Sequence, residues 1–354
     1  MLHSTPTHPA FRGGLLALLA AALFGVSTPL VQKFGEGIGA FSTAALLYTG
    51  AVMVGAVSRK RVEREARVTR ADTPRLIAVA LFGAVIGPVA LAWGLQHTSG
   101  TSASLMLTLE ALFTALLSWK LYGETMDRRV WTAMFLLLAG GAILVLDQGR
   151  GGGIELWGML AVLLATAAWG MDNTLSRALA ERDPSQVVML KAALGVSATT
   201  LLAVVFGERV PPWQAVLALM AIGATGYGLS LRFYLLAQRA FGAGRTGSVF
   251  AFAPFIGAVL AFALGDRSAS LVMAVGGLLM LLGVALHLAE THHHEHTHDA
   301  LEHEHAHTHD DGHHEHLHAD DAPLPVGAHS HRHRHEPLRH AHAHVPDVHH
   351  AHPH

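Results

Sequence analysis

The sequence predicts an all-α membrane protein: ten transmembrane helices in two inverted five-helix repeats, followed by a disordered, histidine-rich tail. Three observations predict this fold class: apolar runs of spanning length, cationic loops that alternate along the chain, and a sequence pattern shared by the two halves. The composition agrees, because 51% of the 354 residues are hydrophobic and only 14% are charged. Soluble domains carry about 25% charged residues, so this chain lacks the charges that a water-facing surface needs.

Ten apolar runs occupy the first 289 residues. A helix needs about 20 mostly apolar residues to cross a bilayer core of about 30 Å. The runs lack the polar stripe of a soluble amphipathic helix, and their frequent glycines favour close helix packing. The predicted spans are residues 13–32, 39–57, 76–96, 101–121, 130–147, 157–177, 187–206, 213–235, 246–265 and 270–289.

The lysines and arginines of the joints predict the orientation. Joints on the amino-terminal side hold fifteen of them, seven in the 58–75 loop, whereas the opposite side holds four. Cationic loops face the cytoplasm, so we expect a multi-pass protein of the cell (inner) membrane with both termini cytoplasmic. The first run has no A-x-A-like cleavage site after it and nine spans follow, so we expect it to be retained.

The two halves of the chain match each other. The segment GGLLALLAAALFG at 13–25 pairs with GMLAVLLATAAWG at 158–170. Further matches share one offset of 142 residues: Gln96 with Gln238, Gly100 with Gly242, and Gly123-Glu124 with Gly265-Asp266. Five spans per copy force the second copy to insert upside down, as in the inverted repeats of secondary transporters. Chance matching of Ala/Leu/Gly-rich helices is the alternative.

The predicted organisation has five parts. They are a cytoplasmic N-terminus (1–12), the first repeat (13–147), a linker (148–156), the second repeat (157–289) and the tail (290–354).

Two segments resemble a known family. The stretch LQHTSGTSASLMLTLEALFTALLSWKLYGETMDRRVW with FLLLAGGAILVL, and the later LLAQRAFGAGRTGSVFAFAPFIGAVLAFALGD with GGLLMLLGVAL, are similar to EamA repeats of the drug/metabolite transporter superfamily. The resemblance covers residues 13–289 and implies ten helices, an inverted repeat, a central cavity and export of small metabolites. Ala111 follows Glu110 where the family commonly has Pro, Pro254 has no acid before it, and Asp266 replaces the usual Glu. The resemblance therefore specifies architecture better than cargo. The tail also resembles that of an EamA subgroup with a histidine-rich C-terminus.

Glu110 is the clearest ionisable group at bilayer depth, because apolar or small residues surround it in the middle of its run. Such groups are costly in a membrane and usually face a cavity or a partner. We interpret Glu110 as a proton-coupling or cation-binding carboxylate. The alternative is a structural carboxylate that hydroxyls such as those of Thr108 and Thr114 satisfy.

The sixth span carries a second polar group, which we interpret as a kink in that helix. Trp169, Asp172 and Asn173 form it, opposite Ser27 and Thr28 of the first span, which also carries Pro29. Broken or kinked helices in corresponding positions of the two halves indicate a transport site. Asp172 could instead pair with Arg177 near the cytoplasmic interface.

Four other residues are weaker candidates for contact with the substrate: Arg232, Tyr227, Lys191 and His97. Arg232, beside Tyr227, lies one turn inside the cytoplasmic end of the eighth span and could contact an anionic substrate, although a long cation there often extends to the interface. Lys191 at the start of the seventh span has the same two interpretations. His97 is an interfacial histidine, which is usually structural.

Catalysis is not expected. The chain has no cysteine, no Walker A lysine loop and no HExxH, and its glycine pairs lack the strand–helix context of dinucleotide binding. No cofactor is expected to be required. The expected partners are the lipid bilayer and a small-molecule substrate, without nucleic acid, and a homodimer is one option for the assembly.

The tail concentrates the histidines. Residues 290–354 hold 24 of the 28, with twelve acids and three arginines, for a formal charge of −9 against +7 for the rest. Imidazole with carboxylate suits Zn, Ni, Co or Cu, and the low complexity predicts disorder without metal. Protonation of the imidazoles could instead dock the tail on the 58–75 loop, or the tail could have no role in transport. The predicted metal ligands are His292, His293, His294, His296, His298, His303, His305, His307, His309, His313, His314, His316 and His318.

These observations together predict a secondary active transporter that exports a small polar metabolite by alternating access and carries a metal-binding cytoplasmic tail. The alternatives are a transition-metal (Zn/Ni/Co) transporter and a membrane-anchored metal buffer or sensor. The predicted spans lack a cluster of ligands able to hold such a metal as cargo.

Overall fold

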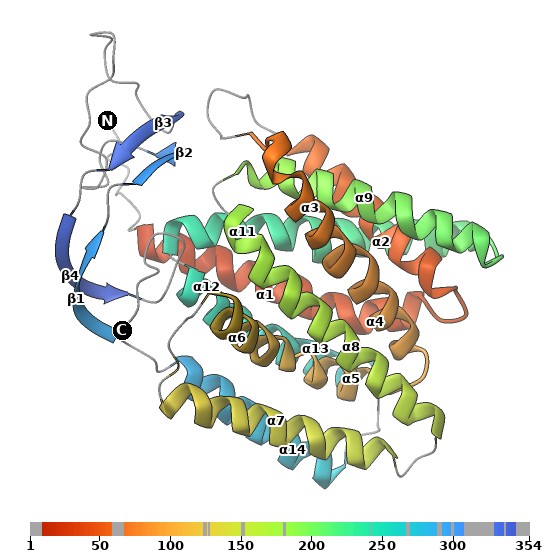
Figure 1. The fold of residues 1–354 in the computed structure, drawn as a ribbon. Coiled ribbons are helices and arrows are strands. Elements are labelled where there is room, and N and C mark those ends of the chain that lie inside the picture. Colours follow the sequence, from red (N-terminus) through yellow and green to blue (C-terminus); the bar gives the residue numbers. More distant parts are fainter. Residues whose placement is uncertain are drawn as a thin grey trace, which may run out of the picture.

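The protein is described here from a computed structural model. It describes residues 9–58, 67–122, 126, 128–149, 153–179, 182–241, 243–266, 270–288, 292–298, 301–307, 329–335 and 338–344. As far as residue 288, the described chain is a bundle of helices (Figure 1).

The first half of the bundle runs from α1 to α7 and the second from α8 to α14. The first consists of α1 (Pro9–Phe34), α2 (Ala40–Val57), η2 (Arg70–Asp72), α3 (Thr73–Ala80), η3 (Leu81–Ile86), α4 (Gly87–Leu95), α5 (Gly100–Met106), α6 (Leu109–Tyr122) and α7 (Arg128–Gly149). The second consists of α8 (Gly153–Ser176), η4 (Arg177–Leu179), α9 (Pro184–Val205), α10 (Trp213–Ile222), η5 (Gly223–Leu229), α11 (Ser230–Phe241), α12 (Ala243–Phe250), α13 (Ala253–Ala263) and α14 (Leu271–Leu288).

The described residues contain eight helical segments that are long and apolar enough to cross a membrane. Two shorter apolar helices, Ala253–Ala263 and Leu271–Leu286, lie where the sequence predicts the ninth and tenth spans. Large apolar side chains cover the outside, among them Phe135 (68% exposed) and Val259 (71% exposed). Lipid rather than water suits such a surface, so the chain is an all-helical, multi-pass membrane protein.

Helix interruptions lie in the third, fourth, eighth and ninth spans of the described chain rather than in the sixth, where the sequence predicts a kink. α8 is one helix from Gly153 to Ser176, whereas π-helical segments interrupt the third span at η3 and the eighth at η5. Pro88, directly after η3, has no N–H to continue the helical hydrogen bonds. The two π-helical segments begin at Leu81 and Gly223, at the 142-residue offset seen in the sequence.

Two glycines that match in the sequence make equivalent close approaches. A Cβ on Gly25 would lie 2.3 Å from the Ala253 carbonyl oxygen, so α1 packs directly on the backbone of α13. A Cβ on Gly170 would lie 2.6 Å from the Phe113 Cβ, so α8 packs closely on α6. Each close contact joins one half of the chain to the other, as small residues in membrane bundles allow.

Helices of the first half contact helices of the second half throughout the bundle. α2 packs extensively on α9, α7 on α14, α4 on α8 and α1 on α11. α7 and α14 lie side by side at one edge of the bundle (Figure 1). Because most helices pack mainly on the opposite half, the centre of the bundle is lined by residues from both halves.

The described part of the tail forms four strands, and the disorder predicted for the tail as a whole stays a prediction. β1 (His292–His298) pairs antiparallel with β4 (Leu338–His344), and β2 (Leu301–His307) pairs with β3 (His329–His335). The His-x-His spacing has the two-residue period of a strand, and amino-acid composition alone carries no information on spacing. His309, His313, His314, His316 and His318 lie outside the described residues.

Candidate functional site

A cavity lies where the two halves meet, and the non-atom space within it and at its opening is about 500 Å³. Residues from α1, α2, α6, α8, α9, η5, α11 and α12 line it. The charged and polar lining side chains are Glu110, Asp172, Asn173, Lys191 and Ser230, and the aromatic ones are Phe24, Tyr48, Trp169, Tyr227, Tyr234 and Phe250.

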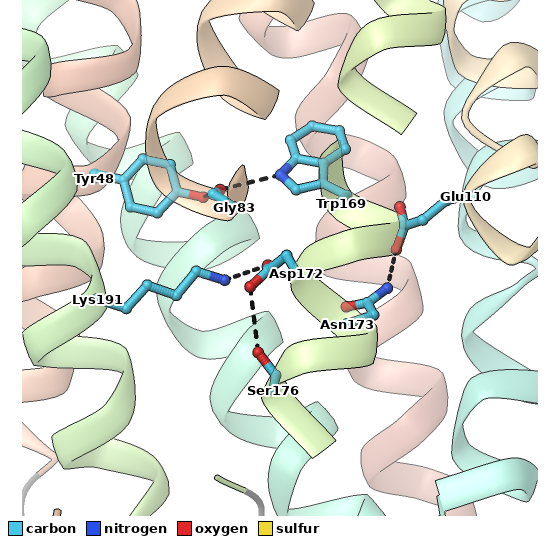
Figure 2. Close-up of polar contacts among 8 residues, drawn as sticks. All are labelled: Tyr48, Gly83, Glu110, Trp169, Asp172, Asn173, Ser176 and Lys191. Carbon is cyan, nitrogen blue, oxygen red and sulfur yellow. Dashed lines mark hydrogen bonds and ion pairs between the residues drawn. The ribbon is translucent and has the colours of Figure 1, made fainter. Parts of the chain in front are cut away.

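A buried ion pair joins two helices at the cavity. The Nζ of Lys191 on α9 donates to Oδ2 of Asp172 on α8, and the two residues are only 4% and 5% exposed (Figure 2). Ser176, one turn further along α8, donates to the other oxygen, Oδ1, of Asp172 at 3.2 Å. A buried charge must be paired and hydrogen-bonded, and these contacts meet both needs for Asp172.

Gly83 in η3 lies against this ion pair. A Cβ at this position would be 2.2 Å from Oδ2 of Asp172 and 2.6 Å from Nζ of Lys191. No side chain fits there without displacing the pair, which explains the glycine.

The carbonyl of Gly83 is also the acceptor for two aromatic side chains. The Gly87 N–H donates to the Phe82 carbonyl, and Pro88 has no N–H, so the irregular helix leaves the Gly83 carbonyl for side chains. Nε1 of Trp169 donates to it at 3.1 Å, and the Tyr48 hydroxyl donates as well (Figure 2). The π-helical segment thus orients two rings of the cavity.

Glu110 belongs to the first turn of α6, where the chain resumes the helix after α5. Nδ2 of Asn173 donates to its Oε1 at 2.6 Å. The hydroxyl partners suggested by the sequence do not serve this carboxylate: Thr114 donates to the Glu110 backbone carbonyl, and the Thr108 hydroxyl has no partner in the described structure. Asp172 and Asn173 are consecutive on α8 and point to different neighbours, the first to Lys191 and the second to Glu110 (Figure 2).

Six aromatic rings surround these polar groups. The Phe24 centroid lies 5.6 Å from that of Trp169, 5.9 Å from that of Tyr227 and 5.4 Å from that of Phe250. Tyr48 and Tyr227 are 5.6 Å apart, and Tyr234 and Phe250 are 5.0 Å apart. These spacings are those of interacting ring pairs, so the rings form one continuous aromatic wall.

The structure brings five of the predicted substrate residues to the cavity: Glu110, Trp169, Asp172, Asn173 and Tyr227. The other three lie elsewhere. Ser27 and Thr28 are buried in α1 outside the lining, with the Ser27 hydroxyl donating to the Phe24 carbonyl at 2.6 Å. Arg232 points to the N-terminus of α9, where its Nε donates to the Ser185 hydroxyl at 3.3 Å.

Tyr48 and Phe250 are lining residues that the sequence gives no reason to select, because each is one aromatic in an apolar run. Lys191 had a signal, a lysine inside a predicted span, but its partner is not visible from the sequence. Asp172 pairs with Lys191, whereas the side chain of Arg177, the alternative partner, lies outside the described part of the chain.

No group of three or more His, Cys, Asp or Glu side chains is placed to hold a metal ion among the residues that the structure describes. The side chains of the predicted tail ligands lie outside that description, so the metal-binding tail stays a prediction.

Comparisons with known proteins agree with the fold. The EamA-like transporter family matches residues 11–146 and 156–289. An uncharacterized transporter of Methanothermobacter thermautotrophicus is 28% identical over 238 residues, which are 66% of this chain and 69% of that protein. A solved crystal structure, described only as that of a protein, shares the fold with a TM-score of 0.57 at 20% identity, covering 77% of this chain and 94% of that one. Spanning helices, a charged cavity between two halves and a family match over both of them lead to one conclusion: this chain belongs to the EamA-like transporter family and is a membrane transporter, not an enzyme.

Proposed function

We propose that the protein is a secondary active transporter that exports a small polar metabolite through the cavity by alternating access. The observation that carries the proposal is a cavity at the meeting of the two halves that is lined by the half-buried Glu110 and Asn173 and by the buried Asp172 and Lys191. Ionisable side chains inside a membrane protein mark substrate or ion pathways. A substrate bound between two halves can be exposed to either side of the membrane when one half tilts against the other.

A ten-span architecture of two inverted repeats underlies this proposal. It is supported by the equal offset of the η3 and η5 segments and by the matched approaches of Gly25 and Gly170. The helix packing agrees with this symmetry. The third span corresponds to the eighth and the sixth to the first, so the α4–α8 contact corresponds to the α11–α1 contact, and both are present. Cationic loops favour cytoplasmic termini and a place in the inner membrane.

Glu110 is the proposed coupling group. Asp172 has a cationic partner and Glu110 has a neutral amide, so Glu110 can exchange a proton or a cation without breaking an ion pair. Protonation of a buried carboxylate removes the cost of burying its charge. The free-energy difference between protonated and ionised Glu110 therefore changes when the exposure of the cavity to water changes.

We further propose that the tail binds a divalent transition metal such as Zn, Ni, Co or Cu, with no cofactor required by the transport domain. The β2–β3 register supports this, because it sets His303 opposite His333 and His305 opposite His331. Borderline metals suit imidazole ligands. A membrane-anchored metal buffer or sensor is the second candidate function that this register favours. Homodimer formation stays a prediction.

Single-cysteine labelling tests alternating access, since the chain has no cysteine of its own. Leu231→Cys places a thiol on the cavity wall, and Val259→Cys places one on the apolar outer surface. We expect a charged, membrane-impermeant methanethiosulfonate to label Leu231→Cys both in right-side-out and in inside-out vesicles. Val259→Cys should resist labelling from either side, because lipid excludes the reagent. Labelling of Leu231→Cys from one side under every condition would contradict alternating access.

A further inference from the structure

We infer that the cavity takes a small organic cation, an amine or quaternary ammonium that carries an apolar group, as its substrate. This inference rests on the proposed function and specifies the substrate class of the same site. The juxtaposition that carries it is one carboxylate, Glu110, with no ion-pair partner among the described side chains, in a cavity whose walls are aromatic.

The charges of the lining leave one negative charge to compensate. Asp172 and Lys191 neutralise each other in a buried pair. The third charged group of the described lining is Glu110, and Asn173, its hydrogen-bond partner, carries no charge. An ionised carboxylate at bilayer depth is stabilised by an opposite charge. A bound monocation brings the cavity to neutrality, whereas a bound anion doubles the excess negative charge.

The aromatic wall fits the same ligand class. Phe24, Trp169 and Tyr227 have mutual centroid distances between 5.6 and 6.4 Å, and Phe250 extends this wall 5.4 Å from Phe24. Ring faces attract ammonium groups within about 6 Å of the centroid, and quaternary ammonium ligands are recognised by cages of such rings. The rings also offer the apolar surface that the rest of an amphipathic amine needs.

Other ligand classes fit less well. An anion or a zwitterionic amino acid needs a cation for its carboxylate, and the lysine of the described lining is already paired with Asp172. A bare metal ion needs several oxygen or nitrogen ligands, and the described part of the chain holds no such cluster.

Binding measurements with a matched panel test the inference. The panel is phenethylamine (cationic at neutral pH), benzyltrimethylammonium, 2-phenylethanol, 3-phenylpropionate and phenylalanine, which share one phenyl ring and differ in charge. Calorimetry on the full chain in lipid nanodiscs gives each dissociation constant. We expect both cations to bind about tenfold tighter than 2-phenylethanol, as one added interaction of a charged group allows. 3-Phenylpropionate should bind weakest. This ranking needs no variant, so it does not depend on the folding of a mutant.

Two substitutions assign the preference to its atoms. Glu110→Gln should weaken both cations about tenfold or more and leave 2-phenylethanol nearly unchanged. The control Glu155→Gln, in the first turn of α8 and outside the cavity lining, should change neither. Phe24→Leu should weaken benzyltrimethylammonium several-fold, and Phe135→Leu on the lipid-facing surface should not.

Three results would overturn the inference: no binding of either cation, equal affinity for the whole panel, or tightest binding of 3-phenylpropionate. An unchanged ranking in Glu110→Gln would likewise remove Glu110 as the recognising group. The labelling of Leu231→Cys from both sides does not depend on these results, so a failure of the substrate class is distinguishable from a failure of the transport site.

Discussion

The Asp172–Lys191 pair offers a quantitative test of how the cavity is held together. Lys191→Met keeps the approximate length of the side chain and removes its charge. The Asp172 side chain, which is 7% exposed, then has only the Ser176 hydroxyl as a described side-chain donor. Removing one partner of a buried pair costs about 3–5 kcal/mol, because the other charge stays buried and unpaired. We therefore expect Lys191→Met to lower the free energy of unfolding by about 3–5 kcal/mol.

The double variant separates the charge from the loss of contacts. Asp172→Asn combined with Lys191→Met removes both charges, so we expect it to recover most of the stability that Lys191→Met loses. Denaturant unfolding followed by intrinsic tryptophan fluorescence measures Lys191→Met, the single variant Asp172→Asn and the double variant in one detergent. The Arg182–Asp72 pair is the comparison, since the Arg182 side chain is 21% exposed and Asp72 also accepts hydrogen bonds from the Thr69 N–H and hydroxyl, each at 2.8 Å. Arg182→Met should therefore cost less than Lys191→Met, because the Asp72 carboxylate keeps those two donors.

A free energy of unfolding for Lys191→Met within about 1 kcal/mol of the wild-type value would refute the reasoning, because removing one partner of a buried pair costs more than that. So would a double variant that is as unstable as the sum of the two single ones, since that result would show no coupling between the two side chains.

Three further predictions concern coupling, backbone packing and the tail. Glu110→Gln should make substrate flux into proteoliposomes independent of an imposed pH gradient; unchanged coupling in a well-inserted variant would exclude Glu110 as the coupling group. Gly83→Ala should cost about 1–3 kcal/mol in the same unfolding assay, because its Cβ would lie 2.2 Å from the Asp172 carboxylate. Gly153→Ala, where a Cβ meets nothing within 4 Å, should be neutral or slightly stabilising. Deletion of residues 291–354 should abolish retention on immobilised Ni²⁺ and change the effect of Zn²⁺ or Ni²⁺ on transport; identical metal binding and identical rates would leave the tail without a role.

The helical membrane class was predictable because it depends on local properties of the chain. A bilayer offers no hydrogen-bond partners to an exposed backbone, so an apolar run of spanning length becomes a helix whatever its neighbours are. Eight predicted spans correspond to long helices, and the ninth and tenth correspond to the shorter α13 and α14. Pro254 separates α13 from α12, which shortens the ninth span.

The internal irregularities were less predictable. The polar residues of the sixth span suggested a kink, yet α8 runs through them, because polar side chains there find partners on α6 and α9 without disturbing their own backbone. The π-helical segments lie instead in η3, before Pro88, and in the glycine-rich η5.

The sequence by itself determined the membrane class, the matching halves and the presence of rare polar residues in the spans, since each of these depends on residue types and short spacings. Only the tertiary structure decided which of those residues share a cavity. Asp172 and Lys191 lie 19 positions apart on different helices, and Asn173 reaches Glu110 across 63 positions. Ser27, Thr28 and Arg232 are not among the residues that line the cavity. The physical reason is that the direction of a side chain depends on the rotation of its helix in the bundle, and close contacts such as those at Gly25, Gly83 and Gly170 set that rotation between segments far apart in the chain.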